Sequence, residues 1–248
     1  MARLEASAAS PRPGSGAMFD AIAHRYDPIN KLMTFGLDRS WREKAVRALA
    51  LPAGARVLDL ATGTGDVALL LARRHPDAQV IGLDPSANML AVGKVKVAER
   101  GLAGRVRLEL GDAEKLPYEN ASFDGVTIAF GIRNVEDRPA ALREIARVLR
   151  PNGRLAILEA NEPRGMLAPL TRLHCRVVVP LIGALLSSRQ EYQYLQSSMA
   201  AFPPPAVFSG ILASCGLEVV REESLGFGTC TLYVAKPALA AAGREGRS

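Results

Sequence analysis

The decapeptide VLDLATGTGD, residues 57–66, contains residue types that could hold a nucleotide-like ligand. An apolar run that carries Asp59 leads into Gly63 and Gly65, and a helical pattern follows. Glycines permit a tight turn and a close approach of the backbone to a ligand, at a helix N-terminus whose free N–H groups receive polar groups. Asp84 ends the next apolar run about 20 residues later, where an acid can take a ribose diol.

The residues of the glycine turn favour S-adenosylmethionine over a dinucleotide as the cofactor. Gly-Thr-Gly-Asp is not the G-x-G-x-x-G pattern, and Asp66 places a carboxylate where a pyrophosphate would be repelled. A cofactor without phosphate and with a cationic, amine-bearing end suits this turn better. After the third apolar run, LGDAEKLPY places Asp112 where it could accept a hydrogen bond from an adenine amino group, with Ala113 beside it. Each feature alone also occurs in ordinary packing, but the three together at the carboxyl ends of strands predict a cofactor site.

Short apolar runs alternate with helical patterns along the first two thirds of the chain. The predicted strands are 56–61, 78–84, 105–111, 123–130 and 153–160. The clearest helical pattern covers 137–149, with Asp137 as its N-cap and Pro139 in its first turn. The alternation stops after Glu162, and a helical, apolar stretch is followed by two strands that turn at Gly226–Gly228. We therefore expect βαβ units, a mostly parallel sheet and an antiparallel pair at its edge.

These patterns predict a single domain over residues 18–237. Within it, residues 18–50 are expected to form a helical lid, and residues 163–215 a helical substrate lobe. The small and polar segments 1–17 and 238–248 are predicted to be a disordered leader and a disordered tail.

The composition limits the cellular compartments and the classes of binding partner that the sequence is compatible with. Three widely spaced cysteines form no CxxC or His–Cys cluster, so neither a disulfide framework nor a metal site is predicted. No signal-peptide core occurs and no apolar run reaches the ~18 residues of a membrane span, so we expect a cytoplasmic protein with at most a peripheral membrane contact. The net charge of +6 is modest and no basic–aromatic stripe accompanies it, which disfavours a nucleic-acid partner.

Five blocks of the sequence resemble, in order, those of the ubiquinone/menaquinone C-methyltransferase (UbiE/MenG) family of class I methyltransferases. The blocks are MFDAIAHRYDPINKLMTFGLDRSW, DLATGTGD, FGIRNVED, RVLRPNGRL and EYQYLQSSM. The resemblance implies a Rossmann-like α/β sheet of seven strands, mostly parallel with an antiparallel edge strand, and S-adenosylmethionine as the methyl donor. It implies methylation of a ring carbon of a polyprenylated hydroquinone. It also implies four cofactor contacts, at Thr64, Asp84, Asp112 and Ala113.

The sequence departs from the family pattern at several positions. Asp38 stands where the family usually has histidine, and Ala129 stands where it often has serine. The family's Glu-x-Ser after the fifth strand is Glu159-Ala160-Asn161 here. These departures leave the cofactor site intact and leave open which quinone is methylated.

The block FGIRN, residues 130–134, places an arginine and an asparagine where the fourth strand emerges at the cofactor edge. A hydroquinone that loses a phenolic proton becomes a phenolate, whose ortho carbon can attack a methyl donor. Arg133 stays protonated and can hold that phenolate, and Asn134 can orient the same oxygen or a water. The resemblance suggests that Arg133 acts with a water that takes the proton. The alternative is that Arg133 pairs with Glu136 or Asp137 and caps the next helix.

The lid and the apolar lobe supply the remaining candidates, each of which simple packing would also explain. We expect the lid to exclude water from the site, and the apolar segment 176–188 to receive a prenyl tail. The polar candidates are His24, Tyr26 and Asp27 of the lid, and Tyr192 and Tyr194 on the quinone side.

The leading hypothesis is an S-adenosylmethionine-dependent C-methyltransferase that converts a demethylmenaquinol to menaquinol. The same chemistry would serve a ubiquinone precursor, 2-methoxy-6-polyprenyl-1,4-benzoquinol, or another lipid or polyketide phenol. A non-catalytic scaffold that binds S-adenosylmethionine is the hypothesis from a different class, and a homodimer is compatible with either. The intact Gly63, Gly65, Asp84, Arg133 and Asn134 favour the enzyme.

Overall fold

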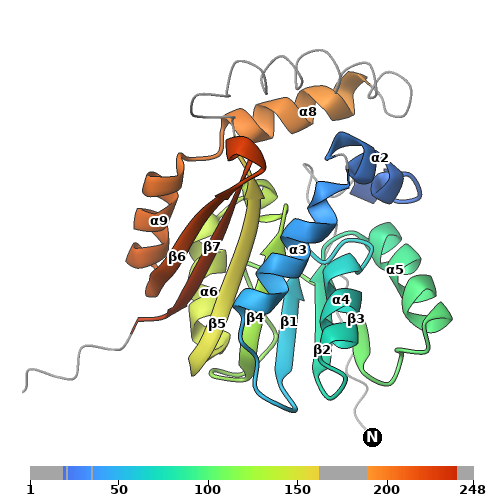
Figure 1. Ribbon diagram of the computed structural model, residues 1–248, viewed down its shortest axis with the longest axis vertical. Helices are drawn as coiled ribbons and strands as arrows, with labels where there is room; N and C mark the ends of the chain where they lie inside the picture. The colour runs from blue at the N-terminus through green and yellow to red at the C-terminus, as the bar shows by residue number, and fades with distance from the viewer. Residues whose placement is uncertain (1–18, 21, 35, 162–188, 239–248) are drawn as a thin grey trace, which may run out of the picture.

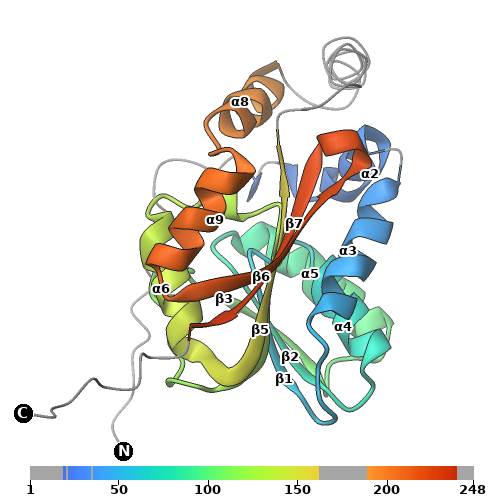
Figure 2. The ribbon, with the colours of Figure 1, turned by 60° about the vertical axis from the view of Figure 1, so that its left-hand side comes forward.

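The computed structural model describes residues 19–20, 22–34, 36–161 and 189–238. They form a seven-stranded sheet in the order β3-β2-β1-β4-β5-β7-β6, with helices on both faces (Figure 1, Figure 2). The strands are β1 Arg56–Leu60, β2 Gln79–Asp84, β3 Val106–Leu110, β4 Phe123–Ala129, β5 Leu149–Ala160, β6 Leu217–Leu225 and β7 Cys230–Pro237. The helices are α2 Tyr26–Met33, α3 Leu37–Ala48, α4 Asp66–Arg74, α5 Ala87–Glu99, α6 Arg138–Val148, α8 Arg189–Ala200 and α9 Pro205–Ser214, with short 3-10 turns η1 Ile132–Asn134 and η2 Gly226–Gly228. The predicted Rossmann-like sheet is confirmed.

Strands β1 to β5 run parallel to one another, so their carboxyl ends meet at one edge of the sheet, here called the carboxyl edge. The predicted antiparallel pair is also present. β7 runs antiparallel to both β5 and β6 and lies between them, which leaves β6 as the outer strand. The helices α2 and α8 lie over the carboxyl edge in Figure 1.

Apolar side chains pack on both faces of the sheet, which explains why the central strands read as nearly continuous apolar runs. On one face, Val57 of β1 packs in a core with Ala68 of α4. On the other face, Leu58 packs in a core with Ile145 of α6 and Phe208 of α9. Burial on both sides fixes the register of β1, because a shift by one residue would exchange the two faces.

All five predicted parallel strands are present, but β5 begins at Leu149, before the predicted start at Gly153. The sequence Pro-Asn-Gly favours a turn at this point. The chain instead stays extended through an irregular pairing, with a register shift between Phe123 and Gly125 of β4. The predicted helix 137–149 corresponds to α6, whose N-cap Asp137 accepts a hydrogen bond from the backbone N–H of Ala140 at 2.8 Å.

The described parts of the predicted lid and lobe are helical. The lid contains α2 and α3, and the lobe contains α8 and α9. The predicted leader, the apolar segment 176–188 and the tail after Ala238 lie outside the described residues. Within the described ranges, no helix is long and apolar enough to cross a membrane.

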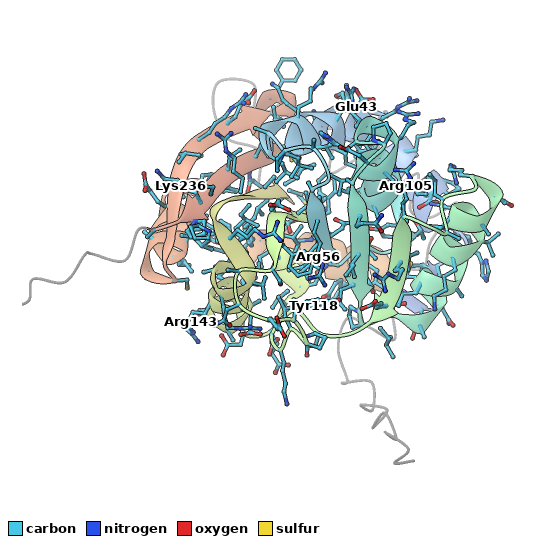
Figure 3. The ribbon with its side chains drawn as sticks, turned by 90° about the horizontal axis from the view of Figure 1, so that it is seen from below. Glu43, Arg56, Arg105, Tyr118, Arg143 and Lys236 are labelled. Atoms are coloured by element: carbon cyan, nitrogen blue, oxygen red, sulfur yellow. The ribbon has the colours of Figure 1, made fainter. Side chains whose placement is uncertain are left out.

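Figure 3 shows the opposite edge of the sheet, where the parallel strands begin. Arg56, at the start of β1, places its guanidinium over the ring of Phe123 at 4.7 Å, and Tyr118 packs edge-on against the same ring. Asp124 of β4 accepts hydrogen bonds from the backbone N–H of Arg56 at 2.8 Å and from Arg150 Nη1 at 2.5 Å. These contacts secure the strand starts far from the carboxyl edge.

Candidate active site

Asp59 lies buried near the end of β1, under the glycine turn. Thr62 Oγ1 donates to Asp59 Oδ2 at 2.6 Å, and Thr127 Oγ1 of β4 donates to Oδ1 at 2.7 Å. Burial raises the pKa of Asp59 from 3.8 to about 6, although the two threonine hydrogen bonds act in the opposite direction. Asp59 therefore shapes the floor of the site by tying the turn to the neighbouring strand.

The turn itself requires glycine. Gly63 and Gly65 adopt φ values of 55° and 82°, in the left-handed region that other residues rarely occupy. Helix α5 approaches closely, since a Cβ atom added to Gly93 would lie 3.1 Å from the carbonyl oxygen of Thr64. The turn is thus held between α4 and α5, with Gly65 as the N-cap of α4.

Asp84 ends β2 beside this turn and is buried. The backbone N–H of Gly63 donates to Asp84 Oδ2 at 2.8 Å, and that of Ser86 donates to Oδ1 at 2.9 Å. Burial raises the pKa of Asp84 from 3.8 to about 6, and these two hydrogen bonds oppose the rise. Each oxygen keeps a second lone pair, so the carboxylate can accept further hydrogen bonds from a ligand diol.

Asp112 and Ala113 follow β3 at the same edge. Asp112 Oδ1 accepts a hydrogen bond from the backbone N–H of Glu114 at 2.9 Å, and Ala113 packs against the core of one face. The backbone N–H of Gly111 donates to the carbonyl oxygen of Asp84 at 3.1 Å. The structure thus brings the predicted Asp84, Asp112 and glycine turn together at the carboxyl edge.

Asp66 begins α4, directly after the turn. Its carboxylate is bound by two cations, Lys96 Nζ at 2.7 Å and Arg42 Nη1 at 3.2 Å. Arg42 also pairs with Asp38 at 2.6 Å. The carboxylate of Asp66 is therefore engaged in an ion-pair cluster.

The lid is fastened to the turn by polar contacts. Thr64 Oγ1 donates to Asp27 Oδ1 at 2.6 Å and accepts from Lys96 Nζ at 2.9 Å, and Lys96 also pairs with Asp27. The hydroxyl of Thr64 is therefore engaged by the lid, and a cofactor would contact this residue through its backbone. His24 is exposed, whereas Tyr26 is half-buried.

A small hollow opens between the turn and the helical segment above it. The residues that line the hollow are Tyr26, Arg42, Asp59, Ala61, Thr62, Gly63, Thr64, Asp66, Val67 and Ala129. A polar turn, buried carboxylates and small residues at the ends of β1 and β4 suit a ligand with a ribose and a cationic end.

Arg133 lies beside this hollow in η1. A Cβ atom on Gly131 would lie 2.4 Å from Cβ of Ala61, so η1 packs directly against a residue of the hollow. Arg133 Nη1 donates to Glu159 Oε1 at 2.6 Å and to the carbonyl oxygen of Phe130 at 2.6 Å. Burial acts to lower the pKa of Arg133, but Glu159, Tyr26 and Tyr194 together raise it by more, so the group stays cationic.

The partner of Arg133 is therefore Glu159, and not Glu136 or Asp137 as the alternative interpretation of the sequence had it. Asn134 lies next to Arg133, and Tyr194 of α8 donates to its Oδ1 at 3.2 Å. The side chain of Tyr192 lies outside the described residues. Tyr26 and Tyr194 both lie close enough to Arg133 to interact with its charge.

Glu159 and Lys96 were missed as members of the site. A signal existed for Glu159, because an acid at the end of a strongly apolar run must find a partner when the strand is buried. No such signal existed for Lys96, since a lysine on a helix normally faces solvent.

The chain is similar to known methyltransferases along most of its length. Residues 10–236 match the model of the ubiE/COQ5 methyltransferase family. The chain is 48% identical over 227 residues to the ubiquinone/menaquinone biosynthesis C-methyltransferase UbiE of Syntrophotalea carbinolica, with 90% of this chain and 94% of the relative covered. It is 44% identical over 219 residues to the demethylmenaquinone methyltransferase of Thermus thermophilus, with 88% and 98% covered.

Solved structures share its fold. A SAM-dependent methyltransferase from Aquifex aeolicus aligns with a TM-score of 0.64 at 20% identity, covering 88% of this chain and 98% of that one. A SAM-dependent methyltransferase from Thermotoga maritima aligns with a TM-score of 0.62 at 22% identity, covering 89% and 98%. At these identities the likeness concerns the fold alone.

Proposed function

The chain belongs to the ubiE/COQ5 methyltransferase family, and from this premise we propose that it methylates a ring carbon of a demethylmenaquinol to give a menaquinol. Its methyl donor is S-adenosylmethionine, as the family and the fold imply. The observation that supports the proposal is the close approach of Gly131, the N-cap of η1, to Ala61 of the hollow, because η1 carries the cation of Arg133. Methyl transfer to a ring carbon needs a group beside the cofactor that stabilises the phenolate form of the substrate.

We assign the cofactor to the carboxyl edge, across the glycine turn and the ends of β2 and β3, beside the small hollow. Asp84 would accept from the ribose hydroxyls, the Gly63–Gly65 turn would approach the methionine portion, and Asp112 and Ala113 would contact the adenine. Asp59 supports the turn from below. When bound, the cofactor supplies an electrophilic methyl group on its sulfonium.

On the substrate side, Arg133 and Asn134 are the proposed catalytic residues. The guanidinium would stabilise the phenolate oxygen of the quinol, whose ortho carbon is then electron-rich enough to attack the methyl group. The hydrogen on that carbon would then leave as a proton, to the ring oxygen or to water, which restores the aromatic hydroquinone. Asn134, held by Tyr194, would orient the same oxygen or a water that takes the phenolic proton. The lid, fastened at Asp27, would exclude water while the ring carbon is held in line with the methyl group.

The test is to express the protein in a host that lacks its own quinone C-methyltransferase and to analyse the quinones by mass spectrometry. We expect methylated menaquinone to appear. If methylated ubiquinone also appears, the protein serves both rings. If neither quinone is methylated while the purified protein binds S-adenosylmethionine, the acceptor is a different phenol and the proposal is wrong.

We further propose that the protein works in the cytoplasm with a peripheral contact to the membrane that holds its polyprenylated substrate. Two exposed apolar side chains at the carboxyl edge support this idea: Phe227 of η2 is 72% exposed and Leu37 of α3 is 45% exposed. The two elements touch, because a Cβ atom on Gly226 would lie 2.5 Å from Cζ2 of Trp41. Exposed apolar groups beside a site for a lipid suit an interfacial contact.

A further inference from the structure

Glu159 is the most completely buried charged side chain in the neighbourhood of Arg133. Its side chain is 0% exposed and that of Arg133 is 8% exposed. Removing a carboxylate and a guanidinium from water is costly unless the two groups pair with good geometry. The contacts of this buried pair are therefore the place to ask what it does at the carboxyl edge.

The geometry shows what Glu159 fixes. Oε1 accepts from Arg133 Nη1 at 2.6 Å, while Oε2 accepts from the backbone N–H of Arg133 at 3.1 Å. One carboxylate therefore holds both the side chain and the main chain of the same residue. Oε1 also accepts from the backbone N–H of Ala160 at 2.8 Å, which fixes the carboxylate itself at the end of β5.

The second contact of Nη1 adds to this restraint. Nη1 donates to the carbonyl oxygen of Phe130, a residue with a φ of 58° in the left-handed region. A left-handed conformation is uncommon for phenylalanine and persists only where its surroundings enforce it. The bend from β4 into η1 is thus held by Arg133 and, through Arg133, by Glu159.

One hydrogen-bond donor of Arg133 is not used by the described part of the protein. Its Nε atom is buried and has no hydrogen-bond partner among the described residues. A buried donor of a charged group requires an acceptor, and a phenolic oxygen of the substrate, or a water bound with it, has the right chemistry. The Nη1 side of the guanidinium is bound within the protein, and the Nε–H is the donor that still needs an acceptor.

We propose that Glu159 is a positioning residue for methyl transfer, which holds Arg133 by its side chain and backbone so that the guanidinium can meet a substrate oxygen. The inference rests on the proposed function, since it concerns the quinol-binding side of that same site. Glu159 itself neither donates nor accepts a proton in this proposal. Other polar or titratable groups lie around the pair, namely Tyr26, Tyr194, Cys230, Tyr233 and Arg138.

The test is a double-mutant cycle of Glu159→Gln, Arg133→Met and the double variant. Turnover of a short-chain demethylmenaquinol and the melting temperature are measured for each protein. We expect Glu159→Gln to lower kcat on the order of 100-fold, with a smaller change in KM, because the guanidinium is no longer held in place. In the double variant kcat should equal that of Arg133→Met, because Glu159 acts only through Arg133.

The melting temperatures separate positioning from folding. Glu159→Gln should melt lower than the wild type, because it leaves Arg133 buried and unpaired. The double variant should recover the melting temperature without recovering kcat. If Glu159→Gln does not fold, a kcat of the double variant well below that of Arg133→Met would still overturn the inference.

Asp124→Asn is the matched control. Asp124 also accepts from one backbone N–H and one arginine, but it lies at the opposite edge of the sheet (Figure 3 labels Arg56, its backbone partner). This variant should lose stability and keep its kcat. A wild-type kcat in Glu159→Gln, or a kcat in the double variant well below that of Arg133→Met, would overturn the inference.

The result that would contradict the proposed function differs from the result that would contradict the role of Glu159. A wild-type protein that methylates no quinol would contradict it, and the melting temperatures of the cycle would then still show whether Glu159 and Arg133 act as a pair. Independent losses of stability in the two single variants, with no recovery in the double variant, would refute that pairing.

Discussion

Asp59 and Asp84 are both buried carboxylates at the carboxyl edge, yet their partners suit them to different tasks. Asp59 accepts from two threonine hydroxyls of the protein, so it belongs to the framework of the turn. Asp84 accepts from two backbone N–H groups on neighbouring loops, which fix its oxygens at the rim. Of the two, Asp84 is the one placed to bind a diol.

We predict that Asp84→Asn weakens the binding of S-adenosylmethionine by about 10- to 100-fold. Hydrogen bonds to a charged acceptor contribute about 1.5–3 kcal/mol, and the amide of asparagine presents one acceptor instead of two. Isothermal titration calorimetry measures the change directly. Asp77→Asn is the control, because Asp77 also accepts from a backbone N–H, at 2.6 Å, but lies in an exposed loop. An unchanged affinity in Asp84→Asn would remove this residue from the cofactor site.

At the scale of elements, the lid is attached to the sheet through α4 and α5. Asp20 accepts from Ser86 Oγ at 2.5 Å and from the backbone N–H of Asn88 at 3.1 Å, at the start of α5. Asp27 of α2 is held by Thr64 and by Lys96 of α5. Polar contacts between elements therefore help to close this side of the hollow.

We predict that Lys96→Met loosens the lid. The ammonium contacts Asp27, Thr64 and Asp66 together, and a partly exposed cluster of this kind contributes about 1 kcal/mol. Amide hydrogen exchange in residues 22–33 should become about fivefold faster. The methionine keeps the apolar stem of the lysine, so packing along α5 is retained.

Lys94→Met is the control for this prediction, because Lys94 is exposed on the same helix. High salt should accelerate exchange in the wild type and in the control, but not in Lys96→Met, since salt screens exposed ion pairs. Equal exchange in all three proteins would mean that the cluster does not hold the lid.

The elements were largely predictable from the sequence, and the contacts between them were not. The apolar runs and the Asp137 cap are local signals, and they identified the parallel strands and α6. The start of β5 was misjudged because Gly153 favours a turn locally, whereas pairing with β4 keeps the chain extended. The bond between Arg133 and Glu159 joins residues 26 positions apart, and no local pattern encodes such a partner.

At the scale of the whole molecule, the two edges of the sheet differ in role: one stabilises the fold, and the other holds the candidate site. The start of the strands holds ion pairs such as Arg150–Asp124, whose carboxylate also accepts from the backbone of β1. The carboxyl edge instead collects buried carboxylates whose ionisation is opposed by burial, namely Asp59 and Asp84. The molecule thus accepts a loss of stability at the edge where the cofactor is expected to bind.

We predict that Asp59→Asn makes the protein more stable at pH 8 and that the gain disappears toward pH 4. Burial raises the pKa of Asp59 from 3.8 to about 6 in the folded protein, so the folded state holds this proton more tightly than the unfolded chain. The stability that the protonated group provides is fully present below pH 3.8 and is lost as the pH rises through about 6. A neutral amide avoids that loss, which amounts to at most about 3 kcal/mol.

Urea unfolding of the wild type and the variant at pH 4.5 and pH 8 measures the difference, with Asp77→Asn as the control for removing one charge. If Asp59→Asn is instead less stable than the wild type at pH 8, the hydrogen bonds from Thr62 and Thr127 outweigh the cost of burying the charge.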